Sequence, residues 1–533
     1  MGLVFDVAAP LAAPARYRAD VACFIGHVAR RSGRPLPAAL REQLAAAGWT
    51  SGAWARTPAQ VDSLLNLPLA LDSWHLFDRL YAWDDRPLDA AGTRHCASYL
   101  GAAVRSFFAR GGRRAIVIRV GDPWPYLEDG AHRAAQRRTR LRRMLPDFAS
   151  RSAPARPFEP HDPASWQGIQ HLYGLREPSL LLLPDLPDAC AADLPLPDVS
   201  PLPPLPPEGF VECSIEEPVA PDLGLRGLPA PRLDSGGYAA WQLAVAAARG
   251  FLYRWQREVN LVAALPLPHA LATRTRADAS RLHARVDMRA YLQRIGVLLP
   301  EGSAVPDDAS ASAFVQLAWP WLRCADAGDL PEGLAPPDGV LAGLVARGAL
   351  QNGAFRSVAG DGSLAALRDV ADALPVPGRG AGESSPDALL ARQVCLFAPQ
   401  PEGWALQSDV TTSPQLAWRF GGASRLMTLI LRAARAVADG VVFEPSGPAL
   451  WARLRGDIED LLMEFWRAGA FAGATAAQAF SVRCDRSTMT QNDLDNGRLI
   501  ALISVRPAAA IERITVVLNL ANSADVAPVR ATA

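Results

Sequence analysis

The order of apolar and polar positions along the chain predicts strands and helices in alternation. Short apolar runs predict buried strands at 21–28, 114–120, 179–183, 259–265 and 395–398. Apolar residues at helical spacing predict helices at 35–47, 72–81, 97–110, 235–258, 415–439 and 448–470. Such alternation is typical of α/β folds, so we expect a mixed α/β (α+β) protein.

The last third of the chain has the most regular pattern. The helix predicted over 448–470 has an apolar stripe and a charged opposite side, and Ser446 is expected to cap it. Its charged side carries Arg453, Asp457, Asp460 and Glu464. Short strands are predicted at 441–443, 480–484 and 499–505, the last two joined by a polar loop with a turn at Asn496-Gly497. Alternating Ile514, Val516 and Leu518 predict a final strand over 514–520.

Proline-rich and irregular segments interrupt the middle of the chain. Residues 184–207 end in PLPPLPP, which predicts a polyproline-type linker or an inserted loop, with an SH3-type ligand as the minority interpretation. Residues 266–310 look irregular apart from a helix expected over 287–295. The loop at 357–387 contains alternating glycines, but they do not lie between a strand and a helix, so a dinucleotide site is not expected.

Composition excludes several classes of function. The chain has 533 residues, which predicts three or four domains, and equal numbers of basic and acidic residues, 54 of each. All the basic residues are arginine, so a P-loop, a kinase lysine and a Schiff-base enzyme are excluded. The neutral total charge argues against a nucleic-acid partner. The arginine-rich helix expected over 131–143 is therefore interpreted as a solvated or subunit-facing surface, with a nucleic-acid patch as the alternative.

No set of residues with recognisable catalytic or metal-binding spacing emerges. The seven cysteines form no CxxC pair, and all eight histidines lie at or before His283 without ligand spacing. Ser487-Thr488-Met489 is a near miss to the subtilisin serine signature, and the run from Asp493 to Gly497 is a near miss to a calcium loop. We expect no catalytic residues, no cofactor and no metal. No signal peptide or membrane span is expected either.

The C-terminal segment 441–520 resembles the C-terminal domain of contractile phage tail sheath proteins. The resemblance rests on a set of short motifs in order, namely Phe443-Glu444-Pro445, Leu450-Trp451, Leu461 to Trp466, Gly469-Ala470, Gly473-Ala474-Thr475, Ala479-Phe480, Cys484-Asp485, Gln491-Asn492-Asp493, Asn496-Gly497-Arg498-Leu499 and Arg506-Pro507-Ala508. Earlier segments agree in kind, including a helix, a Gly-Gly pair and a strand over 97–120. The family includes sheaths of phage tails, R-type bacteriocins and extracellular contractile injection systems.

The resemblance implies a multidomain sheath subunit with extended terminal arms. The expected parts are an N-terminal arm at 1–17, an N-terminal sheath region at 18–125, a subtilisin-like α/β middle region at 126–394 with loop insertions at 184–235, 266–310 and 357–387, a C-terminal sheath domain at 395–520 and a tail at 521–533. The Pro-Gly-Val-Tyr-Val-Glu-like opening strand of the family is missing here, so exchange of the N-terminal arm is left open.

The resemblance also implies a function. Sheath subunits polymerise as stacked rings or a helix around an inner tube, and they contract to drive that tube through a target envelope. Implied partners are copies of the same chain, the inner tube protein, and baseplate and terminator proteins, with no nucleic acid and no membrane insertion. The strand 514–520 is the candidate arm donated to a neighbour, with Ile514, Val516 and Leu518 at the subunit interface, while closing its own sheet is the alternative. Arg453, Asp457, Asp460 and Glu464 are the tube-facing candidates.

Two other functions stay open at this point. One is a low-copy sheath-like cap or baseplate component, and the other is a hydrolase with a subtilisin-like middle domain. Fold topology alone does not establish activity, so we expect a structural protein that is not an enzyme. The implied location is the cytoplasm during assembly and then a phage tail or an extracellular contractile particle.

Overall fold

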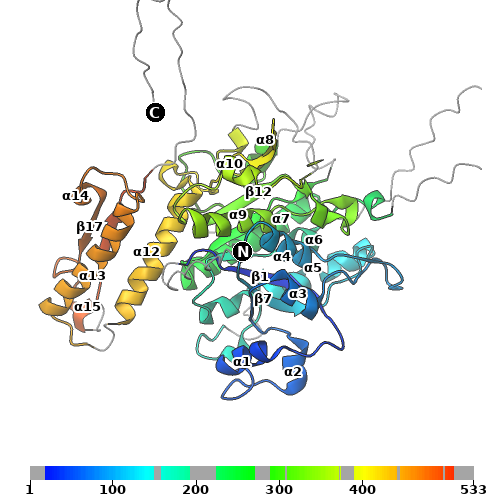
Figure 1. Ribbon diagram of the computed structural model, residues 1–533, viewed down its shortest axis with the longest axis horizontal. Coiled ribbons are helices and arrows are strands. Elements are labelled where there is room, and N and C mark those ends of the chain that lie inside the picture. Colours follow the sequence, from blue (N-terminus) through cyan, green and yellow to red (C-terminus); the bar gives the residue numbers. More distant parts are fainter. Residues whose placement is uncertain are drawn as a thin grey trace, which may run out of the picture. The chain divides into compact units, whose positions relative to one another are not determined.

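The computed structural model describes residues 18–148, 158–191, 224–269, 288–306, 309–370, 372–373, 389–440, 444–495 and 499–508. The chain forms two compact units. Unit 1 comprises residues 1–354 and 358–429, and unit 2 comprises residues 355–357 and 430–533. The mixed α/β fold class expected from the sequence is confirmed (Figure 1).

Unit 1 is built on an eight-stranded sheet. Its order is β16-β15-β12-β10-β8-β1-β7-β3. The strands are β1 (Ala22–His27), β3 (Leu69–Leu71), β7 (Ala115–Gly121), β8 (Leu180–Leu182), β10 (Asn260–Ala264), β12 (Val315–Trp319), β15 (Cys395–Gln400) and β16 (Gly403–Leu406). The six strands from β15 to β7 are parallel, and the edge strands β16 and β3 run antiparallel to their neighbours.

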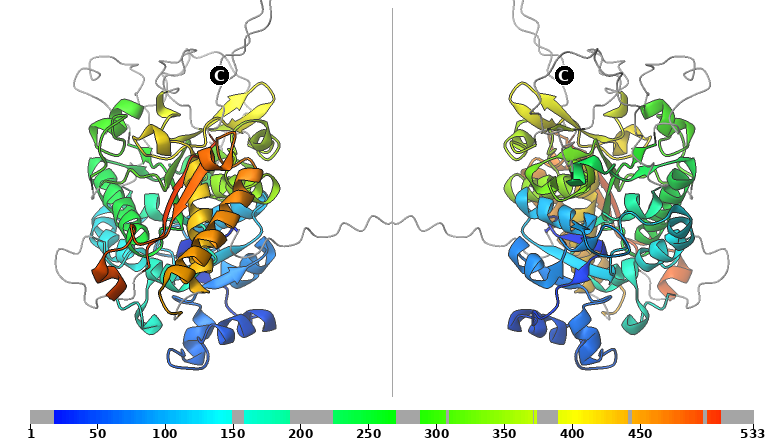
Figure 2. Two further views of the ribbon diagram at one scale, coloured as in Figure 1. Left: turned by 90° about the vertical axis from the view of Figure 1, so that its left-hand side faces the viewer. Right: turned by 90° about the vertical axis from the view of Figure 1, so that its right-hand side faces the viewer.

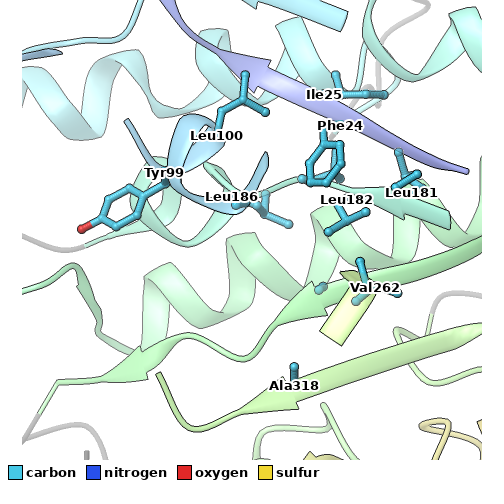
Figure 3. Close-up of a cluster of buried hydrophobic side chains, with 14 of the residues drawn as sticks. Phe24, Ile25, Tyr99, Leu100, Leu181, Leu182, Leu186, Val262 and Ala318 are labelled. Carbon is cyan, nitrogen blue, oxygen red and sulfur yellow. The ribbon is translucent and has the colours of Figure 1, made fainter. Parts of the chain in front are cut away.

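The parallel strands are mostly apolar because helices and loops cover them. Residues 22–27 of β1 are all buried, as a strand covered on both faces requires. Figure 3 shows Phe24 of β1, Leu182 of β8 and Val262 of β10 in one cluster with Leu100 of a neighbouring helix. Each of these four side chains is fully buried, and burying one contributes about 1.5–3 kcal/mol.

The helices of unit 1 are α1 (Ala38–Ala46), α2 (Pro58–Ser63), α3 (Trp74–Leu80), α4 (Tyr99–Ala109), α5 (Gly130–Met144), α6 (Leu186–Cys190), α7 (Ser235–Trp255), α8 (Met288–Arg294), α9 (Asp338–Gln351) and α10 (Asp361–Leu364). The sequence pattern predicted α1, α3, α4, α5, α7 and α8, but it did not predict α2, α6 and α10. Helix α3 is capped by Ser73, whose hydroxyl accepts the amide of Leu76. Gly111 ends the α4 segment with a φ of +102°, a left-handed conformation that glycine adopts readily.

Helices α4 and α9 pack together at unusually close range. A Cβ on Gly339 of α9 would lie 2.4 Å from the Ala103 carbonyl oxygen of α4, and a Cβ on Gly343 would lie 2.7 Å from the Phe107 carbonyl oxygen. Only glycine at these two positions lets the backbones approach so closely. The sequence pattern did not indicate this contact.

Strand β16 forms one edge of the sheet, and the short helix α10 covers it. The Leu406 amide donates to the Ser363 hydroxyl at 2.8 Å, and the Gly360 amide donates to the Leu406 carbonyl oxygen at 3.0 Å. These bonds occupy backbone groups that an edge strand otherwise offers to other chains. Where α10 lies, this edge is therefore protected from pairing with a strand of another chain.

Helix α12 (Gly421–Asp439) begins in unit 1 and ends in unit 2. The sequence predicted a start at residue 415, which is wrong. Residues 411–419 form a bend that contains a short 3-10 helix at Leu416–Trp418, because the Thr411 amide donates to the Arg419 carbonyl oxygen and the Thr411 hydroxyl donates to the Trp418 carbonyl oxygen. Leu416 in this bend is 74% exposed.

Unit 2 contains α13 (Pro448–Arg467), α14 (Ala476–Ala479), α15 (Gln491–Asp495), β17 (Phe480–Arg483) and β18 (Leu502–Val505). The strands form an antiparallel pair that packs along α13 (Figure 2). The predicted helix and both strands are present. Ser446 does not cap α13, since Gly447 holds that position and the Ser446 hydroxyl accepts the indole N–H of Trp451.

The structure does not describe the residues of the predicted strand 441–443, the predicted turn at 496–497 or the predicted strand 514–520. The predicted domain boundaries and the subtilisin-like character of 126–394 remain predictions.

Candidate functional site

The strand order of unit 1 places a topological switch point between β1 and β8. The chain goes from β1 to β7 on one side and then returns to β8 on the other side. Open parallel sheets of this kind bind ligands in the crevice outside the carboxyl ends of such strands. The carboxyl ends of β1 and β8 are therefore the first place to look for a site.

Asp185 fills the space between these two strand ends. Its Oδ2 accepts the His27 amide at 2.6 Å, and its Oδ1 accepts the Leu100 amide at 3.0 Å near the N-terminus of α4. Gly26 makes room for it, because a Cβ there would lie 2.3 Å from Asp185 Oδ2. One buried carboxyl thus joins the end of β1, the end of β8 and the start of α4.

Asp188 of α6 forms a buried ion cluster beside it. Its Oδ2 accepts from Arg86 at 2.7 Å and its Oδ1 accepts from Arg133 at 3.2 Å. The three side chains are at most 3% exposed. Burial alone would raise the pKa of the Asp188 carboxyl, but the Arg86 and Arg133 guanidinium groups hold it below its usual value.

Aromatic rings enclose the same cluster. The Arg86 guanidinium lies 5.1 Å from the ring centre of Tyr126 and 5.3 Å from that of Trp124. Arg140 lies 4.3 Å from the Trp124 ring and forms an ion pair with Glu128 at 2.6 Å. The protein's own charged and aromatic groups therefore occupy the crevice that a ligand uses in related topologies.

Sequence reasoning missed Asp185 and Asp188, because both fall in the segment 184–207 that was interpreted as a linker. In the structure residues 184–191 are buried and carry α6. A usable signal was present, since both carboxylates follow directly after the buried strand predicted at 179–183. The proline content of the segment concealed it.

The arginine-rich helix expected over 131–143 corresponds to α5. Two of its arginines, Arg133 and Arg140, are buried in the ion cluster and its neighbour pair, so they are not part of a solvated surface. Arg138, Arg142 and Arg143 are exposed, as the prediction of a solvated or subunit-facing surface requires. The helix thus carries both buried and exposed arginines, and one exposed arginine, Arg142, donates to the Phe148 carbonyl oxygen.

The described residues of the near-miss motifs make short-range hydrogen bonds, and Asp493 lies in α15. The Ser487 hydroxyl donates to Asp485 Oδ1, and the Thr488 hydroxyl donates to the Ile500 carbonyl oxygen. Asp493 Oδ2 accepts the amide and the hydroxyl of Thr490. Over the described part of the chain, no group of three or more His, Cys, Asp or Glu side chains is placed to hold a metal ion.

Helix α13 carries the tube-facing candidates. Its apolar stripe from Leu450 to Phe465 is buried as predicted, and Arg453, Asp457, Asp460 and Glu464 are exposed. Arg453 pairs with Glu444. Their contact with a tube stays a prediction. The interface candidates Ile514, Val516 and Leu518 lie outside the described residues.

Within the described residues, no helix combines the length and the apolar character that crossing a bilayer needs.

No protein-family model matches the sequence, and no curated protein sequence matches it. Among solved structures, the chain is similar to a chain of the anti-feeding prophage baseplate in its contracted state, with 17% identity, a TM-score of 0.54, and coverage of 98% of this chain and 100% of that chain. A chain of the six-fold symmetrised anti-feeding prophage baseplate gives 16% identity and a TM-score of 0.51 over 98% of both chains. A chain of the contracted anti-feeding prophage helical sheath gives 15% identity and a TM-score of 0.49, covering 98% and 100%.

The first two likenesses establish a fold shared over nearly the whole chain with proteins of a contractile particle. This shared fold confirms the fold that the resemblance of the C-terminal motifs predicted.

Proposed function

We propose that this protein is a structural subunit of a contractile sheath. It polymerises around an inner tube and contracts to drive that tube through a target envelope. The observation that carries the proposal is the fold shared with chains of the anti-feeding prophage over 98% of this chain. The ordered sheath-type motifs of residues 441–520 support it independently, because they are a feature of the sequence.

A structural role without catalysis is supported by the filled switch point. A ligand entering between β1 and β8 would have to displace Asp185 and separate Arg86 from Asp188, which leaves a buried charge without its partner. Breaking such a pair costs about 3–5 kcal/mol. The energy for contraction comes from the larger contacts that subunits make with one another in the contracted state. The bodies of the subunits move as rigid units about hinges to reach that state.

The proposed partners follow from this role. Copies of the same chain form rings or a helix, the inner tube lies inside them, and baseplate and terminator proteins cover the two ends. Strand 514–520 adds to a sheet in a neighbouring copy, and the exposed face of α13 contacts the tube. Subunits assemble in the cytoplasm and end in a phage tail or an extracellular particle.

A second candidate is a low-copy component at the baseplate end. One specific observation favours it, since two similar chains, with TM-scores of 0.51 and 0.54, come from baseplate structures. A protein in this role caps the particle and does not form long polymers. A hydrolase with a subtilisin-like middle region is the third candidate. Labelling by an active-site serine reagent would support it, and we expect no labelling.

Negative-stain electron microscopy of the purified full chain, with and without its tube protein, separates the first two candidates. We expect hollow tubules with regular striation. Single rings or monomers at every concentration, even with the tube present, would point to the baseplate role instead.

A further inference from the structure

The outward side of α7 has few of the charges that a solvent-exposed helix carries. The helix has no charged residue between Ser235 and Ala248, and Arg249 is the first one along it. Leu243 is nevertheless 56% exposed, and Tyr253 is 73% exposed. Surface helices turn polar or charged side chains to water, and an exposed apolar side is typical of a helix that another segment covers.

Four residues form this apolar face of α7, namely Leu243, Ala246, Gly250 and Tyr253. Their spacings of three, four and three residues place them on one side of the helix, over about 15 Å. Ala246 is half-buried, and nothing lies within 4 Å of a Cβ built on Gly250. The face therefore has a large side chain at each end and open space between them.

The segment 296–306 follows one flank of α7 beside this face. Gln242 Nε2 donates to the Gly296 carbonyl oxygen at 2.8 Å, and Arg249 Nη1 donates to the Pro306 carbonyl oxygen at 3.3 Å. Gln242 and Arg249 lie on the same flank because they are two helical turns apart. The segment covers that flank and leaves the large side chains of the apolar face exposed.

The chain leaves the described structure beside the first turn of α7. Helix α6 ends at Cys190, whose carbonyl oxygen would lie 2.5 Å from a Cβ built on Gly237. Residues 192–223 follow and lie outside the described part of the chain. Residues 192–200 alone can span up to about 30 Å when extended. The apolar face extends from about 12 Å to about 27 Å along the helix from its start, so the residues that come next can reach all of it.

We propose that the proline-rich run 201–207 (PLPPLPP) of the same chain packs on the apolar face of α7. A polyproline helix has three residues per turn and rises about 3.1 Å per residue, so Leu202 and Leu205 share one side about 9 Å apart. Two leucines at this distance fit between Leu243 and Tyr253. Proline-rich runs typically bind beside aromatic side chains, because their preformed conformation loses little entropy on binding.

Charges that follow the run match the far end of α7. The run continues into Glu208 and Glu212, which reach past Tyr253 when the run follows the helix from its first turn. Arg254 is exposed at that end, and Nη1 of Arg257 is buried without a hydrogen-bond partner among the described residues. The acidic residues and the basic side chains are complementary, which favours the chain's own segment over another occupant.

Thiol protection tests the contact in dilute full-length protein. The variant carries Gly250→Cys with Cys213→Ser, and the six other cysteines are buried, so a maleimide reports the introduced thiol. The control carries Ala45→Cys instead, at an exposed position of α1. We expect the thiol at position 250 to react at least about tenfold more slowly than the thiol at position 45, because its modification requires the run to detach. Adding Leu202→Ser and Leu205→Ser should remove this difference.

A disulfide identifies the covering segment. Oxidation of a variant with Pro204→Cys and Gly250→Cys, in the same Cys213→Ser background, should join the two positions within one chain. Two cysteines form a disulfide only when their Cα atoms come within about 7 Å of each other. The pair Pro204→Cys with Ala45→Cys is the control, and it should oxidise at least about tenfold more slowly. Non-reducing electrophoresis separates the looped chain from the open chain and from linked dimers.

Three results would overturn the proposal. Equal reactivity of the thiols at positions 250 and 45 would show that the face is open to solvent. Protection that grows with protein concentration, or a disulfide that joins two chains, would show that a second copy covers the face. Protection that survives Leu202→Ser with Leu205→Ser would assign the covering to another segment. None of these results bears on the proposed contractile function, because the measurements need no assembly.

Discussion

Arg425 and Asp409 form a bidentate ion pair in the interior of unit 1. Arg425 Nη1 donates to Asp409 Oδ1 at 2.9 Å and Nη2 donates to Oδ2 at 2.6 Å, and neither side chain is more than 2% exposed. Asp409 also accepts the side-chain amide of Gln316 and the backbone amide of Val358. Every charged atom of this pair therefore has a partner, which is the condition under which a buried ion pair is tolerated.

The pair fixes the first part of α12 to the sheet. Arg425 Nε donates to the Ala354 carbonyl oxygen at 2.7 Å, and the Ser424 hydroxyl donates to Asn260 of β10 at 2.9 Å. This side of the helix is thus held by directional hydrogen bonds in addition to apolar packing. Such bonds specify one orientation of the helix more strictly than apolar contacts alone.

Asp409→Asn should destabilise the protein by about 3–5 kcal/mol, because Arg425 would keep its buried charge without a counter-ion. Urea unfolding followed by circular dichroism measures the loss. The matched control is Glu444→Gln, which breaks the exposed pair with Arg453 and should cost less than about 1 kcal/mol. Equal effects of the two substitutions would contradict the role assigned to the buried pair.

Asp188→Ala tests the cluster at the switch point. It leaves Arg86 and Arg133 buried together without their shared carboxylate, so we expect a loss of about 3–5 kcal/mol. Added formate should restore part of the thermal stability of this variant by supplying a small carboxylate, and it should leave the wild type unchanged. A variant as stable as wild type in the absence of formate would show that the cluster is not needed to close the crevice.

Most of the helices and strands could be predicted from the local pattern of apolar and polar residues. The apolar stripe of α13 is a short-range feature, and it appears in the structure as predicted. The order of the strands in the sheet was not predictable, because pairing joins segments as distant as Cys23 and Leu181. Hydrophobic periodicity says which face is buried but does not say which partner covers it.

The error at 184–191 has a physical cause. Asp185 and Asp188 are buried because partners far along the chain satisfy them. Ser424 and Arg425 of α12 are buried for the same reason. A single sequence assigns such residues to the surface, since the energy of a buried charge depends on contacts that local pattern does not contain.

Gly343→Ala should destabilise unit 1 by about 1–3 kcal/mol, although alanine is the better helix former. The new methyl group would collide with the Phe107 backbone and with Arg110 of the neighbouring segment. Gly456→Ala in α13 is the control, because nothing lies within 4 Å of the added methyl group. It should stabilise the protein by up to about 1 kcal/mol. If α4 and α9 pack this closely, thermal unfolding should show a lower melting temperature for Gly343→Ala and a higher one for Gly456→Ala.

The loss of folding stability at acidic pH should depend on His171. Burial, with a contribution from Arg56, lowers the pKa of His171 to about 3 in the folded chain, against about 6.5 when unfolded. Between these values the unfolded chain binds a proton that the folded chain does not, so stability falls as the pH drops from 6.5 towards 3. His171→Phe keeps the aromatic contacts with Trp49 and Trp166 and removes the proton.

Comparing unfolding free energies at pH 7.5 and pH 4.5 measures this effect. We expect the difference to shrink by about 2–3 kcal/mol in His171→Phe. His75→Phe is the control, because His75 is exposed on α3, and it should leave the difference unchanged. A pH dependence identical in all three proteins would contradict the assignment of a neutral, buried imidazole at position 171.

The alternation within 514–520 gives a matched test of the donated strand. Side chains at Ile514, Val516 and Leu518 share one face of a strand, and Thr515, Val517 and Asn519 share the other. Replacing the first three with serine removes the apolar face that a neighbouring copy would bury, so tubules should be lost while the monomer keeps its melting temperature. Replacing the second three should leave assembly within a few-fold of wild type. If the first variant instead lowers the melting temperature of the monomer, the strand closes the sheet of its own chain.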